Sequence, residues 1–225
     1  MKLVSKNTLL AALLAATSVG AFAADSVDLK VIGTIIPPSC TPTIAGGSIV
    51  DFGRISASTL SNTNFTVLPT KSTSLTVTCD APTKIAVTVV DNRTGSTVPG
   101  IANAISANLN DSYAYGVGSV NGKNVGTYVI NAPATGATGD GAAVDRIASL
   151  DNGQTWYAAT SFSGNWRPVG LDLSWAPTGG STPGAYTIIS QPLNVSLGLN
   201  KISGMPALNQ EVPIDGLATF SLVYL

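Results

Sequence analysis

The chain has 225 residues, of which 11 are Lys or Arg, 12 are Asp or Glu and none is His, for a net charge of −1. This composition argues against nucleic acid as a partner, because phosphate binding depends on clustered Lys and Arg. Without His, the usual general base and any Ser-His or Cys-His arrangement are missing. We therefore expect no enzyme and no catalytic residues.

The first 23 residues have the pattern of a secretory signal peptide. A basic start is followed by an apolar run over residues 9–19, and Ala21-Phe22-Ala23 matches a cleavage site. The apolar run is too short to span a bilayer, which takes about 20 residues. An uncleaved N-terminal anchor is the alternative. We expect an exported mature chain that starts at Ala24 and has a net charge of −3.

Two cysteines, Cys40 and Cys79, are present. In an exported chain an even number favours a disulfide, with two free thiols as the alternative. Closing a loop of this length would stabilise the fold by roughly 4 kcal/mol. Two Cys without His do not complete a zinc shell, so we expect no metal site and no cofactor.

Segments with period-2 alternation predict β-strands along the mature chain. In each of them an apolar residue alternates with a polar one, as in a half-buried strand. Turn residues separate the segments, for example Asp80-Ala81-Pro82 and Pro183-Gly184. The pattern indicates an all-β antiparallel sandwich, with strands at 73–78, 84–89, 170–175, 193–197 and 218–225.

The segment from about 95 to 164 is rich in Gly, Ala, Asn and Thr. Its apolar content is too low for a second core. We interpret it as long loops inserted into one sandwich, with short strands near 113–115 and 127–130.

Three motifs resemble the domains of chaperone–usher fimbrial (pilin) subunits. Gly33 and Ile35 precede Cys40 as in the opening strand of those domains, residues 50–55 resemble the next element, and residues 75–79 resemble the strand that ends on the partner cysteine. A penultimate tyrosine, Tyr224, in the last alternating segment completes the resemblance, which is greatest to beta-fimbriae-type subunits. One departure is Val212, where that family usually has Gly.

The resemblance implies an incomplete immunoglobulin-like sandwich over residues 33–225 that lacks its last strand. A donor strand from another subunit would complete it, a known form of β-strand addition. Residues 24–32 would be the N-terminal donor-strand extension. The implied function is a structural fimbrial subunit for surface adhesion. Its implied partners are other fimbrial subunits, a periplasmic chaperone and an outer-membrane usher, and its location is the fimbrium at the cell surface.

The donor candidate is the alternating segment 27–35, which would span about 30 Å when extended. Because donor and groove lie on different surfaces, the contact would be head-to-tail and would form an open filament. The alternative is that this segment is the first strand of its own sandwich. The side chains expected to enter the groove of a neighbour are Val27, Leu29, Val31, Gly33 and Ile35, whereas Asp28, Lys30 and Thr34 would face outward.

The C-terminal strand is the expected chaperone-binding edge. Phe220, Leu222 and Tyr224 lie on one face at period 2, and we expect them to pack together against the core or the donated strand. The carboxylate of Leu225 would offer a charge to a basic chaperone residue.

Two further groups of residues leave alternatives open. Trp156, Trp166 and Trp175 either pack in the core and loops or stack on sugars. Residues Asp140, Asp145 and Asp151 either stabilise turns or form a loose calcium loop. The second functional hypothesis is therefore a self-contained exported β-sandwich that binds a carbohydrate or another ligand.

Overall fold

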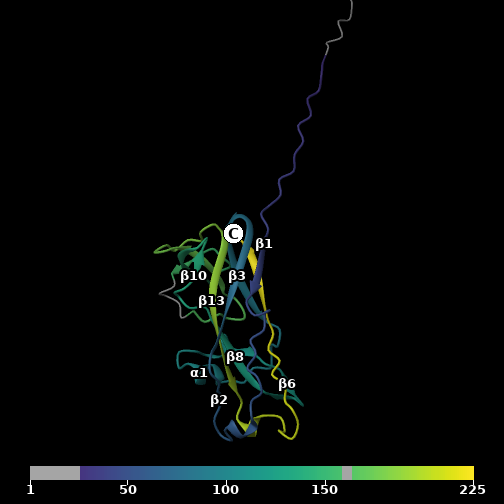
Figure 1. Cartoon of the computed structure of the whole chain (residues 1–225), viewed down its shortest axis with the longest axis vertical. Helices are drawn as coiled ribbons and strands as arrows, with labels where there is room; N and C mark the ends of the chain where they lie inside the picture. Colours follow the sequence, from purple (N-terminus) through teal and green to yellow (C-terminus); the bar gives the residue numbers. More distant parts are fainter. Residues whose placement is uncertain (1–25, 159–163) are drawn as a thin grey trace, which may run out of the picture. The chain divides into compact units, whose positions relative to one another are not determined.

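The computed structural model describes residues 26–158 and 164–225 (Figure 1). The predicted signal peptide, 1–23, and the first two residues of the predicted extension lie outside the described residues. The chain divides into two units, one up to Ile36 and one from Pro37 to Leu225. Among the described residues, no helix is both long and apolar enough to cross a membrane.

The first sheet is antiparallel and is organised around one long strand, β13. The N-terminal half of β13 pairs with β3 and its C-terminal end pairs with β8. In hydrogen-bonded order, its main strands are β1 (Cys40–Ile44), β3 (Lys71–Thr83), β13 (Tyr186–Leu199), β8 (Gly126–Asn131) and β5 (Tyr115–Gly116). The short strand β2 (Thr66–Val67) pairs with the C-terminal end of β13.

The second sheet is also antiparallel and ends on the C-terminal strand. A short strand, β9 (Thr138–Gly139), pairs with both β13 and β10 and so joins the two sheets on one side. In order, the second sheet contains β11 (Tyr157–Ala158), β10 (Ala142–Ser149), β12 (Asp172–Pro177), β4 (Ile85–Asp91) and β14 (Ala218–Tyr224). The all-β sandwich expected from the sequence is confirmed.

Short elements connect the strands. The hairpin of β6 (Ser119–Val120) and β7 (Lys123–Asn124) stands apart from the two sheets. In the part of the chain that the structure describes, helical elements are limited to α1 (Ile101–Ile105) and the 3-10 turns η1 (Ala57–Thr59), η2 (Asp111–Tyr113) and η4 (Ile202–Gly204).

The core lies between the two sheets and follows the predicted alternation. In β3 the buried side chains include Leu75 and Val77, and in β13 every second residue from Ile189 to Leu197 is buried. Trp166 and Trp175 are fully buried, and the indole of Trp175 donates a hydrogen bond to Gln191. These two tryptophans therefore pack in the core, as the first of the two interpretations has it.

The interpretation of residues 95–164 as an insertion is only partly correct. The segment does contain long loops, but β8 and β10 are integral strands of the two sheets. Tyr128 and Ile130 of β8 enter the main core, whereas Val129 faces a small cluster with Ala102. A strand covered on both faces need not alternate, so the pattern that identified the other strands is missing here.

The predicted disulfide is present and joins β1 to β3. Cys40 and Cys79 stand directly opposite each other in the ladder. The expected opening strand from Gly33, however, is wrong, because residues 26–39 form no strand and β1 begins at Cys40. Proline has no N–H to give to a sheet, and Pro37 and Pro38 precede the strand.

We expect Cys40→Ala/Cys79→Ala to lower the free energy of unfolding by roughly 4 kcal/mol, because the cross-link restricts the unfolded chain. Equilibrium denaturation in guanidinium would measure the change. Reduction of the wild-type disulfide should produce the same loss. A change below about 1 kcal/mol would show that the ladder between β1 and β3 holds without the cross-link.

Candidate functional site: an open groove between the two sheets

A single hydrogen-bonded path runs through both sheets, from β1 at one end to β14 at the other. The two end strands lie close to each other but do not pair through their backbones (Figure 1). One hydrogen bond links them, from the backbone N–H of Cys40 to the hydroxyl of Tyr224, at 2.9 Å. The sandwich is thus closed on one side by β9 and left open on the other.

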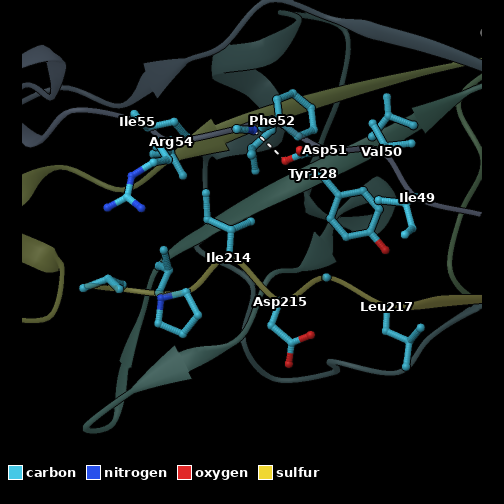
Figure 2. Close-up of a pocket in the computed structure, with 18 of the residues that line it drawn as sticks. Ile49, Val50, Asp51, Phe52, Arg54, Ile55, Tyr128, Ile214, Asp215 and Leu217 are labelled. Atoms are coloured by element: carbon cyan, nitrogen blue, oxygen red, sulfur yellow. Dashed lines mark hydrogen bonds between the residues drawn. The ribbon is translucent and has the colours of Figure 1, made fainter. Parts of the chain in front are cut away.

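A groove with a volume of about 1140 Å³ lies on the open side. Its first wall is the irregular segment 49–55, and its second wall comprises residues 208–220. Its floor is made by side chains of β8 and β13 that belong to the main core, among them Tyr128, Leu193 and Leu197. Figure 2 shows the first wall on one side, Ile214, Asp215 and Leu217 on the other, and Tyr128 between them.

The first wall begins after a turn at 45–48 and places apolar side chains toward the floor. Val50, Phe52 and Ile55 are half-buried against the core, whereas Asp51 and Arg54 are exposed. The Asp51 carboxylate accepts a hydrogen bond from the N–H of Gly53 at 2.7 Å. Apart from that contact, the backbone groups of residues 49–55 make no hydrogen bond to another described residue, so this wall offers unpaired backbone groups.

The second wall divides its residues into two alternating sets. The carbonyl of Leu217 accepts from Asn92, which follows β4, and the N–H of Asp215 donates to the carbonyl of Val117, which follows β5, so these odd-numbered backbone groups are already paired. In an extended chain the neighbouring residues point the opposite way. The even-numbered set therefore directs its N–H and C=O groups toward the groove, and its members in the groove lining are Val212, Ile214, Gly216, Ala218 and Phe220.

Pro213 fits this division. A proline removes one donor from any ladder in which it sits. Because Pro213 belongs to the odd-numbered set, the missing N–H is on the side away from the groove. The edge that faces the groove keeps its donors at Val212 and Ile214.

Tyr128 forms the centre of the floor and is held rigidly. Its ring stacks on Tyr115 with centroids 5.1 Å apart. Burial raises the pKa of both phenols, and the nearby Asp91 carboxylate raises it further, so both remain neutral at ordinary pH. Asp91 itself accepts backbone N–H bonds from Arg93 and Gly116 at 2.8 and 2.9 Å.

Gly216 lies directly over this ring. A Cβ atom built at position 216 would be 2.8 Å from Cε1 of Tyr128, which is closer than carbon atoms pack. The absence of a side chain therefore lets the second wall approach the floor at this point.

Two predicted residues of the C-terminal strand face the core, and two are more exposed. Phe220 packs edge-on against Trp166 at 5.4 Å, and Leu222 contacts the same core. Tyr224, which was expected to pack with them against the core or a donated strand, is 51% exposed in the single chain. At the end of the strand its hydroxyl reaches Cys40 instead, while the N–H of Leu225 donates to the carbonyl of Lys84.

The predicted donor residues are exposed and not part of a sheet. Residues 26–36 form no strand in the structure. The side chains with the alternating pattern are almost fully exposed, at 95% for Val27, 90% for Leu29, 86% for Val31 and 98% for Ile35, and Gly33 is exposed as well.

The aspartates considered for a calcium loop are engaged with backbone groups instead. Asp140 accepts from the N–H groups of Thr187 and Ile188, and Asp145 accepts from Gly179. The N–H of Thr155 holds the pKa of Asp151 down at about 2. Across residues 26–158 and 164–225, no group of three or more acidic, Cys or His side chains could hold a metal ion.

The groove combines an apolar floor with two edges of unpaired backbone. Such a site suits an extended peptide, whose alternate side chains would enter the floor while its backbone pairs with the walls. The sequence analysis missed the part of the second wall that precedes β14. Its signal is present in the even spacing of Val212, Ile214, Gly216 and Ala218, which continues the alternation of the last strand toward the N-terminus.

Comparison with known proteins identifies the family. A family described as "Protein of unknown function (DUF1120)" matches residues 29–129. Protein GltF of Escherichia coli (strain K12) is 33% identical over 254 residues, which cover 98% of each chain. This chain belongs to that family. A second relative, Uncharacterized protein YhcF of the same organism, is 29% identical over 92% of this chain and 94% of its own. The family match includes residues 29–36 of the exposed segment, the disulfide, the first wall and Tyr128.

We expect Gly216→Ala to lower the free energy of unfolding by about 1–3 kcal/mol, because the added methyl collides with a stacked ring that has little room to move. Gly216 has no positive φ, so the effect is steric. Chemical denaturation would measure it. The matched control is Ser221→Ala on the outward face of β14, which should change stability by less than about 0.5 kcal/mol. Equal stability of the two variants would mean that the wall does not rest on Tyr128.

Proposed function

We propose that the protein is a structural subunit of a chaperone–usher fimbria, and that it polymerises by donor-strand exchange. The observation that supports this most is the groove with two unpaired edges in a chain that also carries an exposed alternating apolar segment. Each feature is costly alone, because open sheet edges and exposed apolar strands favour aggregation. A second copy of the chain would satisfy both.

The dimensions of donor and groove agree. Residues 27–35 make a nine-residue segment, and residues 212–220 form a nine-residue stretch of the second wall. Either length corresponds to about 30 Å of extended chain. Full burial of each Val, Leu or Ile of the donor would contribute about 1.5–3 kcal/mol before the entropic cost of association.

The arrangement favours a filament over a closed dimer. The donor segment and the groove are different surfaces, so every copy that donates still has an empty groove. Repetition of this heterologous contact produces an open chain of subunits. This is the property needed for a fimbria on the cell surface.

The proposal includes a periplasmic chaperone and an outer-membrane usher. An empty groove would have to be covered between export and assembly, since unpaired backbone groups and apolar side chains invite aggregation. The edge formed by Phe220, Leu222, Tyr224 and Leu225 is a suitable place for a chaperone strand to bind. We place the subunit in the periplasm during transit and in the fimbrium afterwards.

Two complementary variants test the donor and the groove separately. Val31→Asp puts a charge on the inward face of the donor, and Ile214→Asp puts one on the groove side of the second wall. We expect each variant alone to be monomeric, because a buried unpaired charge is strongly unfavourable. A mixture should form one-to-one dimers, since each variant retains the half that the other has lost. Sedimentation velocity of the mature chains would distinguish these species.

Thr34→Asp is the matched control. It introduces the same charge in the same segment but on the face expected to point outward, and it should polymerise like the wild type. Fibres formed by Val31→Asp, or a mixture that stays monomeric, would contradict the proposal. A wild-type chain that stays monomeric would favour the second hypothesis, a self-contained ligand-binding sandwich.

We expect deletion of residues 223–225 to cause degradation in the periplasm, because the deletion shortens the chaperone-binding edge and removes Tyr224. Protein level and chaperone co-purification would measure the effect. Tyr224→Phe is the control, since it keeps the strand and loses only the hydrogen bond to Cys40, at a cost of about 0.5–1.5 kcal/mol. A wild-type level of the truncated chain, still bound to chaperone, would place recognition elsewhere.

A further inference from the structure

An ion pair crosses the mouth of the groove. Arg54 on the first wall and Glu211 on the second wall approach to 2.6 Å, and their side chains are 92% and 85% exposed. The other two charged residues of the groove lining are already engaged. Asp51 accepts the N–H of Gly53, and Asp215 binds Arg93 at 2.7 Å. Arg54 and Glu211 are therefore the two rim charges that contact only each other.

The exposed segment 26–36 carries a matching pair of charges. Its charged residues are Asp28 and Lys30, both exposed and both on the face opposite Val27, Leu29 and Val31. If the apolar face enters a groove, these two charges must emerge at the rim. Rim and segment then each present one positive and one negative side chain.

We propose that Arg54 and Glu211 form ion pairs with Asp28 and Lys30 of a second copy of this chain. These pairs would fix the register of the donated strand. This inference rests on the proposed function. In the filled groove, Asp28 lies beside Arg54 and Lys30 lies beside Glu211, so that the pair across the empty groove becomes two pairs across the strand edges.

The reach of the side chains permits this exchange. A strand inserted between the walls has neighbours on both sides, with directly opposite residues about 5 Å apart and diagonal residues about 7–8 Å apart. Arg, Lys and Glu are long enough to bridge either separation. Because the rim pair is almost fully exposed, its rearrangement is inexpensive.

Such ion pairs would help to select one register of the donated strand, because the apolar pattern alone defines the register poorly. Val27, Leu29 and Val31 are similar in size and repeat every two residues, so within this part of the donor, apart from Gly33, a shift by two places would still put apolar side chains on the floor. Such a shift would move Asp28 and Lys30 along the rim by about 7 Å and separate them from Arg54 and Glu211. Opposite charges therefore distinguish the correct register from its neighbours.

The test uses full mature chains that carry Val31→Asp, so that the groove is not filled by their own donor segments. The probe is a fluorescent synthetic peptide of residues 26–36, and its dissociation constant is measured by anisotropy. Each of the two rims, wild-type and Arg54→Glu/Glu211→Arg, is combined with each of two peptides, wild-type and Asp28→Lys/Lys30→Asp. The reversed rim keeps an ion pair across the groove, which protects the fold.

We expect both matched combinations to bind alike and both mixed combinations to bind about tenfold more weakly, since two attractive pairs become repulsive. The difference should shrink in 1 M salt, where the screening length is about 3 Å. A peptide with Asp28→Asn/Lys30→Gln should bind the wild-type rim with intermediate affinity. This arm leaves the protein unchanged and holds even if the reversed rim misfolds.

Three outcomes would overturn the inference. Equal affinity in all four combinations would refute the charge reading and leave the proposed function intact. No binding of the wild-type peptide to any chain would refute both. In the third outcome, the Val31→Asp chain binds the peptide, whereas the wild-type chain is monomeric and does not bind it. This result would show that the groove is occupied by the segment of its own chain and not by that of a second copy.

Discussion

The structure depends on one constraint, which is that backbone groups at a sheet edge need partners. From β1 to β14 this requirement is met strand by strand, but along the groove residues 49–55 and the even-numbered residues of the second wall have no counterpart among the described residues. The side chains on the floor there belong to the main core. The groove is therefore the place where the core and the ladder are both incomplete, and one extended strand would complete both at once.

The second wall shows how a single segment can serve two sides. Its odd-numbered residues bind β4 and its neighbours, while its even-numbered residues carry the inward side chains and the free backbone groups. Pro213 lacks a backbone N–H and Gly216 lacks a side chain, and either would weaken an ordinary strand. At these positions the missing N–H is harmless and the missing side chain is useful. The proline lacks its donor on the occupied side, and the glycine admits the ring of Tyr128.

The sequence predicted those strands that have one buried face, such as β3, β4 and β13, because their alternation reports burial directly. It predicted a short strand near 127–130 but not that β8 and β10 are integral to the two sheets, because β8 is covered on both faces and β10 contains several small residues. The alternation of residues 27–35 and of the last strand was noticed for the same reason as that of β3. The upstream part of the second wall was missed because Pro213 and Gly216 interrupt the apolar alternation, and the outward position of Tyr224 depends on a tertiary contact with Cys40.

That contact between Cys40 and Tyr224 joins residues 184 positions apart in the chain. It forms where β1 is also tied to β3 by the disulfide, so the start of β1 is held to β3 by a covalent bond and to the end of β14 by a hydrogen bond. A chain that is cut short before its last strand can form the disulfide but not this link. The link therefore reports that the last strand has been added to the second sheet.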